Sequence, residues 1–255
     1  ERSRAIAEQL AKGVGHLFKK NKITHIEGRG RLLGGGGVEV QEASGGQQSY
    51  TAAHIILATG SRPRDIAILP IDEDRIWSST GALFQTQAPD TLAVVGAGAV
   101  GMEFADVYNA YGTKVTVIEA LDRILPLEDA DSSDAVERSF KKRGMAFHTG
   151  AVVESANILN RSVKLNFKDN KGERQVLKVQ HVLSAVGRVP NTTDLGLDAA
   201  GVELDDRGFF VVDEHLRTSA KGVYAVGDCA GKQLLAHKAM HEGVICVEAI
   251  AGEAH

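Results

Sequence analysis

The stretch that decides the fold is Leu92-Ala-Val-Val-Gly-Ala-Gly-Ala-Val-Gly101. Its first four residues are apolar and predict a buried strand, and the residues that follow the stretch predict a helix. Between them, Gly96, Gly98 and Gly101 form a GxGxxG turn. A second predicted strand, Lys114–Glu119, then ends on an acid. This order of strand, Gly-rich turn, helix, strand and acid predicts a dinucleotide-binding βαβ unit.

Each part of this motif has a physical role in binding a dinucleotide. Gly96 permits the tight turn, Gly98 lets backbone N–H groups approach a pyrophosphate, and Gly101 lets the helix pack on the strand. The helix N-terminus adds partial positive charge for the phosphates. Glu119 can accept hydrogen bonds from ribose hydroxyls and would repel a 2′-phosphate, so we expect NAD rather than NADP, although Arg123 follows closely. The alternative is a Gly-rich turn with a purely structural role.

Composition and charge describe an ordinary globular chain and exclude several function classes. The 255 residues carry 29 Lys and Arg against 33 Asp and Glu, a net charge of −4. This balance leaves no basic surplus for nucleic acid or an anionic membrane surface. The longest apolar run, Leu92–Met102, has 11 residues, and a membrane span needs about 20. We therefore expect neither a nucleic-acid partner nor a membrane span.

The cysteines and a histidine pair indicate no metal site. Cys229 and Cys246 lie too far apart for a CxxC motif, so we expect two free thiols in a reducing compartment. His237 and His241 have the i, i+4 spacing of metal ligands on a helix, but no third ligand is evident. We expect no bound metal.

The rest of the chain reads as alternating helices and strands. We predict helices at 4–20, 131–143 and 232–251, a strand at 23–26, short strands at 38–40 and 49–53, a linker at 64–90 and a three-stranded meander within 151–179. Helical spacing predicts that the last helix turns one face to the core, namely Ala236, Ala239, Met240, Val244, Val247 and Ala251. The βαβ order predicts an α/β fold with a parallel sheet.

One internal repeat joins these pieces. His54–Pro63 (HIILATGSRP) matches His181–Pro190 (HVLSAVGRVP) at His, Ala, Gly and Pro, and a meander precedes each copy. This pattern indicates one supersecondary unit used twice. The Gly-rich turn that belongs to the first copy would fall before Glu1, so we expect this chain to be the interior of a longer protein.

Taken together, these motifs resemble the flavin- and NAD-dependent disulfide reductases, and within them the dihydrolipoamide dehydrogenases. The matching pieces are Ala58–Gly60, Ser79–Leu83, Val95–Glu103, Ala185–Arg188, Tyr224–Asp228 and Leu235–Ala239. The last piece, Leu-Ala-His-Lys-Ala, separates the dihydrolipoamide dehydrogenases from glutathione-type relatives. It also speaks against a related flavoprotein such as a soluble transhydrogenase.

The resemblance implies two Rossmann-like domains joined by a β-meander crossover, with a discontinuous and incomplete FAD domain. It places FAD-domain segments at 1–64 and 209–255, without the first βαβ unit, and an NAD domain at 65–208. It implies FAD contacts at Gly30, Thr59, Gly60, Ser61, Asp228, Leu234, Leu235, Ala236 and His237. It implies NAD contacts at Gly96, Ala97, Gly98, Ala99, Val100, Gly101, Met102, Glu103, Glu119, Val153, Gly187 and Arg188.

The resemblance also implies an activity, in which electrons pass from dihydrolipoamide through a disulfide and FAD to NAD. The implied partners are a lipoyl carrier domain of a 2-oxo acid dehydrogenase complex and a second copy of the enzyme. The implied location is the cytoplasm, or the mitochondrial matrix in a eukaryote. We find neither a CxxxxC redox pair nor the family's catalytic His–Glu pair and dimerisation domain in the sequence. We therefore expect no catalytic residue and no dehydrogenase activity in this segment alone, and a truncated NAD-binding module remains the alternative.

Overall fold

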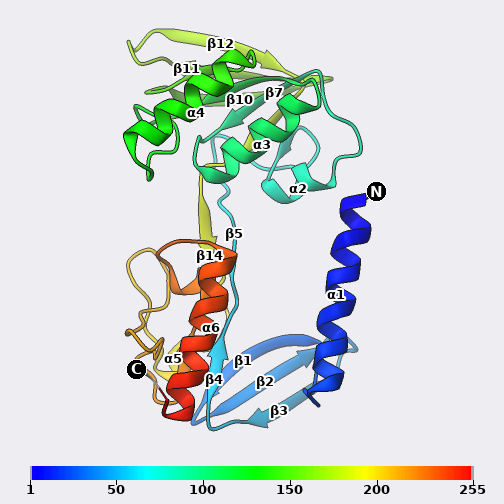
Figure 1. Cartoon of the computed structure of the whole chain (residues 1–255), viewed down its shortest axis with the longest axis vertical. Helices are drawn as coiled ribbons and strands as arrows, with labels where there is room; N and C mark the ends of the chain where they lie inside the picture. The colour runs from blue at the N-terminus through cyan, green and yellow to red at the C-terminus, as the bar shows by residue number, and fades with distance from the viewer. Residues whose placement is uncertain (1, 254–255) are drawn as a thin grey trace. The chain divides into compact units, whose positions relative to one another are not determined.

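The computed structural model describes residues 2–253, which form two compact units (Figure 1). The central unit is Ser61–Val189, and the discontinuous unit combines the residues up to Gly60 with those from Pro190 onward. Each unit has its own hydrophobic core.

A five-stranded parallel sheet forms the middle of the central unit. Its order is β6 (Ile76–Trp77), β13 (His181–Ser184), β7 (Thr91–Val95), β8 (Lys114–Ile118) and β9 (Ala146–His148). Alternating residues of each strand point to opposite faces, so each face needs its own cover. Leu92 and Val94 of β7 belong to one core cluster, and Ala93 and Val95 belong to the other.

Helices cover one face of this sheet and a meander covers the other. The core on the helical side includes residues of α2 (Ser79–Phe84), α3 (Ala99–Ala110) and α4 (Ala130–Lys142). The core on the other side includes residues of β10 (Val152–Leu159), β11 (Ser162–Lys168) and β12 (Arg174–Val179), an antiparallel meander. The predicted α/β fold with a parallel sheet and a meander is confirmed (Figure 1).

The discontinuous unit is built from short elements. It contains α1 (Arg2–Lys20), an antiparallel sheet of β1 (Gly28–Gly34), β2 (Gly37–Glu42) and β3 (Gln47–Thr51), and a parallel pair of β4 (Ile55–Leu57) and β15 (Val223–Ala225). Helices α5 (Leu197–Ala200) and α6 (Ala236–Ala251) and the 3₁₀ turn η1 (Gly227–Ala230) complete it. Its core includes Leu32, Leu57, Phe210, Val223 and Cys229.

The two copies of the repeat form two equivalent segments that pair with each other. Strands β5 (Ser61–Pro63) and β14 (Arg188–Pro190) pair with each other, and each follows a glycine with positive φ, Gly60 at 71° and Gly187 at 116°. The N–H of Arg64 donates to Gly187, and the N–H of Asn191 donates to Gly60, both at 3.0 Å. In each copy, the glycine carbonyl accepts a hydrogen bond and the N–H of the residue four positions later donates one.

The unit boundary lies before the expected one at residue 208. Residues after Val189 bond to the discontinuous unit, because Leu32 donates its N–H to Leu195 at 2.7 Å and α5 packs on β1. The segment 190–208 therefore contributes to the core of the discontinuous unit, whereas the family resemblance grouped it with the NAD domain.

Two predicted elements were wrong. Residues 23–26 form no strand, and Ile23 and Ile26 are exposed, because pairing with β2 begins only at Gly28. The predicted linker contains β6 and α2. Ser78 caps α2 by accepting hydrogen bonds from the N–H groups of Thr80 and Gly81. The prolines of the predicted linker lie outside β6 and α2, so they do not prevent a buried strand and a capped helix from forming there.

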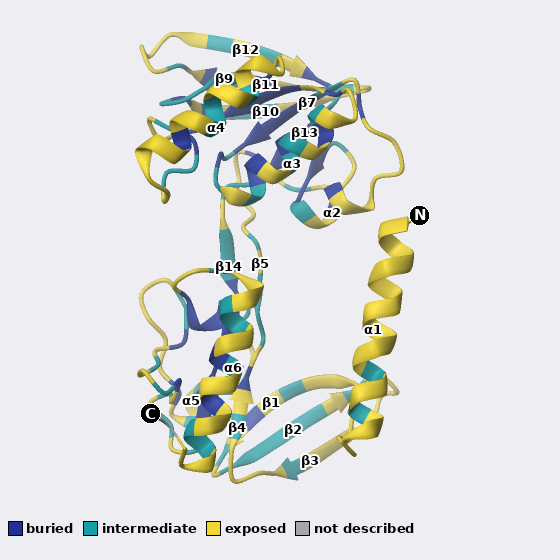
Figure 2. Ribbon diagram, in the orientation of Figure 1, coloured by how far each residue is buried: buried dark blue, intermediate teal, exposed yellow. Residues whose placement is uncertain are grey.

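The predicted core face of the last helix was also wrong. Met240, Val244 and Val247 are 72%, 55% and 55% exposed, whereas Glu242 and Cys246 are buried. Glu242 can be buried because its carboxylate forms an ion pair with Lys238 and accepts the N–H of Gly227. The predicted N-terminal helix is confirmed as α1, but none of its residues is buried (Figure 2). No helix among residues 2–253 is long and apolar enough to cross a membrane.

Candidate dinucleotide site

A cavity of about 360 Å³ opens at the carboxyl ends of β7, β8 and β13, where ligands bind in open α/β sheets. It lies within the central unit. The lining residues come from the Gly-rich turn, the ends of β8 and β13, the start of β10 and the segment after β5: Ile66, Ile68, Val95, Gly96, Gly98, Ile118, Glu119, Ala120, Ala151, Val152, Val153, Ala185, Val186 and Gly187.

The three glycines of the turn differ in what a side chain would meet. A Cβ at Gly96, whose φ is 98°, would overlap the carbonyl oxygen of Ala185, and a Cβ at Gly101 would overlap that of Gly96. At Gly98 a Cβ would meet no atom within 4 Å, although Gly98 lines the cavity. Two glycines are therefore required by the fold, and the third leaves open space where a ligand fits.

Glu119 holds the Gly-rich turn from the end of β8. Its Oε2 accepts the N–H of Ala97 at 2.6 Å and its Oε1 accepts the N–H of Leu121 at 2.8 Å. The residue is 8% exposed and lines the cavity. Since each carboxylate oxygen can accept a second hydrogen bond, ribose hydroxyls fit the remaining acceptor positions. The sequence did not predict that Glu119 also accepts hydrogen bonds from the backbone of this turn.

Only part of the predicted NAD set lines the cavity. The structure brings together Gly96, Gly98, Glu119, Val153 and Gly187. Ala97, Gly101 and Met102 are buried, and Ala99 and Glu103 are exposed on the first turn of α3. Val100 also belongs to that turn and is half-buried. The isoleucines at 66 and 68 were missed because they stand in the segment read as a linker.

Arg188 lies beside the cavity and is bonded to β5. Its Nε donates to Ser61 Oγ at 2.7 Å and its Nη2 to the Ser61 carbonyl at 2.8 Å. These bonds join two positions that the sequence assigned to different cofactors, NAD for Arg188 and FAD for Ser61. In the structure they hold β5 against β14.

A second cavity, of about 540 Å³, lies in the discontinuous unit and contains two predicted flavin contacts, Gly30 and Thr59. The Thr59 hydroxyl is buried and has no hydrogen-bond partner among residues 2–253. A buried polar atom without a partner is costly, so this hydroxyl fits a polar ligand group. The other predicted contacts do not line this cavity: Gly60, Ser61, Asp228 and Leu234–His237.

A buried ion pair fixes the turn that carries Asp228. Glu242 Oε2 accepts the N–H of Gly227 at 2.7 Å, and its Oε1 lies 2.9 Å from Lys238 Nζ. Lys238 also donates to the Gly231 carbonyl at 2.8 Å. The two side chains are only 12% and 16% exposed. They connect α6 to both ends of η1, which contains Asp228.

We expect Glu242→Ala to destabilise the discontinuous unit by about 2 kcal/mol, because a buried N–H loses its acceptor and a buried ammonium loses its carboxylate. Urea-dependent thiol labelling checks this, since Cys229 and Cys246 are both buried in this unit. Glu248→Ala, on the exposed side of α6, is the matched control and should change stability by less than about 0.5 kcal/mol. Equal labelling midpoints for the two variants would contradict this role of the ion pair.

The two thiols of the described chain, Cys229 and Cys246, are free and buried. Burial raises the pKa of the Cys246 thiol, which disfavours its nucleophilic thiolate form. No group of three or more His, Cys, Asp or Glu residues within 2–253 is placed to hold a metal ion.

Comparison with known proteins identifies the family. A profile of the pyridine nucleotide-disulphide oxidoreductases matches residues 1–243, almost the whole chain. The chain belongs to this pyridine nucleotide-disulphide oxidoreductase family. The resemblance seen in the motifs is therefore confirmed at the level of the family.

Members of the pyridine nucleotide-disulphide oxidoreductase family with curated names are closely similar to the chain. It is 40% identical over 265 residues to a dihydrolipoyl dehydrogenase of Rhizobium etli, covering 98% of the chain and 55% of that protein. It is 42% identical over 253 residues to one of Chlorobaculum tepidum, covering 99% and 54%. The chain thus spans about half the length of the curated relatives it matches.

Solved structures of the family show the same fold. LpdA from Mycobacterium tuberculosis superposes with a TM-score of 0.92 at 32% identity, covering 99% of this chain and 56% of that one. The HOCl-induced flavoprotein disulfide reductase RclA from Escherichia coli, as a Cu(II) complex, gives 0.80 at 28% identity, covering 89% and 50%.

Proposed function

We propose that the chain is the dinucleotide-binding part of a dihydrolipoyl dehydrogenase. In the whole protein, electrons would pass from dihydrolipoamide through a disulfide and FAD to NAD. The observation that carries this proposal is the cavity of the central unit, where Gly98 leaves open space beside the buried carboxylate of Glu119. The 40% and 42% identity to named dihydrolipoyl dehydrogenases supports the choice within the family.

NAD is assigned to the central unit. Gly96, Gly98 and the N-terminus of α3 would bind the pyrophosphate through backbone N–H groups, and Glu119 would accept the ribose hydroxyls. Val153 and Gly187 would line the rest of the site. The chain's own contribution is to orient the nicotinamide nucleotide and to select it by charge.

FAD is assigned to the discontinuous unit. Gly30 and Thr59 line its cavity, and the Thr59 hydroxyl is available to hydrogen-bond the ligand. Asp228 would bind a flavin hydroxyl from η1, which Glu242 and Lys238 hold in place. Bound FAD supplies the electron transfer between the dithiol and NAD. We assign neither Cys229 nor Cys246 to the dithiol, because both are buried and they are not a close pair.

The partners and location of the whole protein are also proposals. A dihydrolipoyl dehydrogenase meets its substrate on a lipoyl carrier domain of a 2-oxo acid dehydrogenase complex and acts as a homodimer. We propose these partners for the protein that contains this chain, together with a place in the cytoplasm. The named relatives support this proposal.

We expect NADH to bind at least about tenfold more tightly than NADPH, a difference of about 1.4 kcal/mol. Glu119 would repel a 2′-phosphate. Arg123 is held by the loop that follows it, because its Nη2 donates to the Pro126 and Glu128 carbonyls at 3.2 and 2.9 Å. Calorimetric titration with both nucleotides measures the preference.

A charge-neutral variant provides the control. Glu119→Gln keeps an acceptor for one backbone N–H but removes the negative charge. The ratio of the NADH affinity to the NADPH affinity should therefore become smaller. Equal affinities of the unmutated chain for NADH and NADPH would overturn the assignment of NAD to this cavity.

A further inference from the structure

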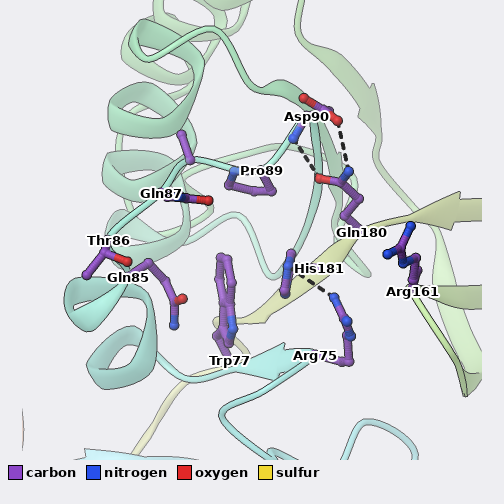
Figure 3. A pocket seen from close by; sticks show the side chains of 11 residues that line it. Arg75, Trp77, Gln85, Thr86, Gln87, Pro89, Asp90, Arg161, Gln180 and His181 are labelled. Atoms are coloured by element: carbon purple, nitrogen blue, oxygen red, sulfur yellow. Dashed lines mark hydrogen bonds between the residues drawn. The ribbon is translucent and has the colours of Figure 1, made fainter.

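A third cavity, of about 520 Å³, lies in the central unit (Figure 3). It is at the opposite edge of the central sheet from the dinucleotide cavity. It borders the amino ends of two strands, because His181 begins β13 and Asp90 directly precedes β7. Its lining is largely polar and is made by Arg75, Trp77, Gln85, Thr86, Gln87, Ala88, Pro89, Asp90, Arg161, Gln180 and His181. None of these residues lines the dinucleotide cavity.

Two stacked rings form a rigid wall of this cavity. Trp77 and His181 lie nearly parallel, with centroids 4.2 Å apart, and Trp77 is 1% exposed (Figure 3). Trp77 Nε1 donates to the Asp74 carbonyl at 3.0 Å, and His181 Nδ1 lies 3.0 Å from the same oxygen. Burial and the charge of Arg75 lower the pKa of His181, against the opposing effects of Asp74 and Asp72. These causes favour the neutral form of the ring.

The positive charge of the cavity comes from two arginines on the same side of His181 (Figure 3). Arg75 Nη2 donates to the carbonyl oxygen of Asn160 at 3.4 Å, which brings Arg75 to the β10–β11 turn that also contains Arg161. The Arg75 side chain is 23% exposed, and its only carboxylate neighbour in the described chain is Asp74, at 4.0 Å and itself 82% exposed.

This charge is not neutralised by the acid in the lining. Arg161 makes no hydrogen bond or ion pair with any residue in 2–253. Asp90 is bonded to Gln180 instead: its Oδ2 accepts from Gln180 Nε2 at 2.9 Å, and its N–H donates to Gln180 Oε1 at 2.7 Å. Arg75 and Arg161 thus both line the cavity, and the only carboxylate within 4.0 Å of either among residues 2–253 is the exposed Asp74, an arrangement that favours a bound anion.

We propose that this cavity binds a phosphate group, free or as the monoester of a small polar molecule. The forked guanidinium groups of Arg75 and Arg161 match the geometry of phosphate oxygens. Thr86 and Gln87 line the other side of the stacked rings and offer hydrogen-bonding groups to the rest of a monoester (Figure 3). The volume is within the range of small-molecule sites, about 300–1,000 Å³.

Fluorescence of Trp77 tests the proposal directly, since it is the only tryptophan in the chain and lies in the wall of the cavity. The probes are inorganic phosphate and glucose 6-phosphate, each compared with potassium chloride at equal ionic strength. We expect a saturable change in emission with phosphate probes. Tighter binding of glucose 6-phosphate would assign a monoester to the site, and equal binding would assign free phosphate.

A matched pair of variants locates the binding. Arg161→Gln should weaken phosphate binding about tenfold, because one charge-assisted contact is lost. Arg138→Gln removes another exposed arginine, on α4 and outside the cavity lining, and should leave the affinity unchanged. Neither change should alter the affinity for NADH. The absence of a saturable response in the unmutated chain, or an Arg161→Gln affinity equal to that of Arg138→Gln, would overturn the proposal.

Discussion

We expect Gly98→Val to weaken NADH binding at least about 100-fold, a loss of about 2.7 kcal/mol, without unfolding the chain. A Cβ at Gly98 would meet no atom within 4 Å, and Gly98 lines the cavity. The new methyl groups would take the space in which backbone N–H groups approach the pyrophosphate. Titration calorimetry measures the affinity.

The stability of the same variant separates binding from folding. Trp77 belongs to the core of the central unit, so its fluorescence in urea reports the unfolding of that unit. We expect the midpoint of Gly98→Val to stay close to that of the unmutated chain. A variant that stays folded and still binds NADH with unchanged affinity would show that the turn is only structural.

We expect Gly101→Ala to destabilise the central unit by about 4 kcal/mol, an effect large enough to unfold much of it. Gly101 is buried on the first turn of α3, and its Cβ would overlap the carbonyl oxygen of Gly96. Because that oxygen belongs to the backbone of the Gly-rich turn, the helix must shift away from β7 and lose packing on both sides. Urea unfolding followed by Trp77 fluorescence measures the loss.

Gly98→Ala is the matched control for this second change. It adds the same methyl group three residues earlier in the same turn, where there is open space and the backbone is extended. Comparable destabilisation by the two alanine variants would contradict the distinct roles assigned to the two glycines.

The central unit could be predicted well from the sequence because its signals are local. Four apolar residues, a Gly-rich turn and a helical pattern follow one another within Leu92–Ala110, and the structure contains β7 and α3 there. The position of Glu119 at the end of the next strand could be predicted for the same reason. The two bonds that Glu119 accepts from Ala97 and Leu121 could not, since they depend on how the turn folds over β8.

The last helix shows where periodicity fails. Its apolar residues surround much of the helix, so spacing alone could not choose the buried face. The structure buries Glu242, because Lys238 and the N–H of Gly227 compensate its charge. The i, i+4 spacing of Lys238 and Glu242 could have indicated an ion pair, but such a pair is more often found on a solvent-exposed face.

The cavity with the two arginines could not be predicted from the sequence. Arg75, Arg161 and His181 stand far apart in the chain and meet only because β6, β13 and the β10–β11 turn come together at one edge of the central unit. The same holds for Ile66 and Ile68, which reach the dinucleotide cavity from a segment without a motif.

The most direct test of the account is to map NADH on the chain by amide chemical shifts in two-dimensional nitrogen–proton NMR. We predict saturable shifts that centre on Gly96, Gly98, Glu119 and Gly187, the residues that the structure brings together at the carboxyl edge of the sheet. The amides around Arg75 and Arg161, at the opposite edge, should change little. Saturable shifts centred elsewhere, or no shifts at NADH concentrations that saturate relatives of this family, would contradict the assignment of NADH to this cavity.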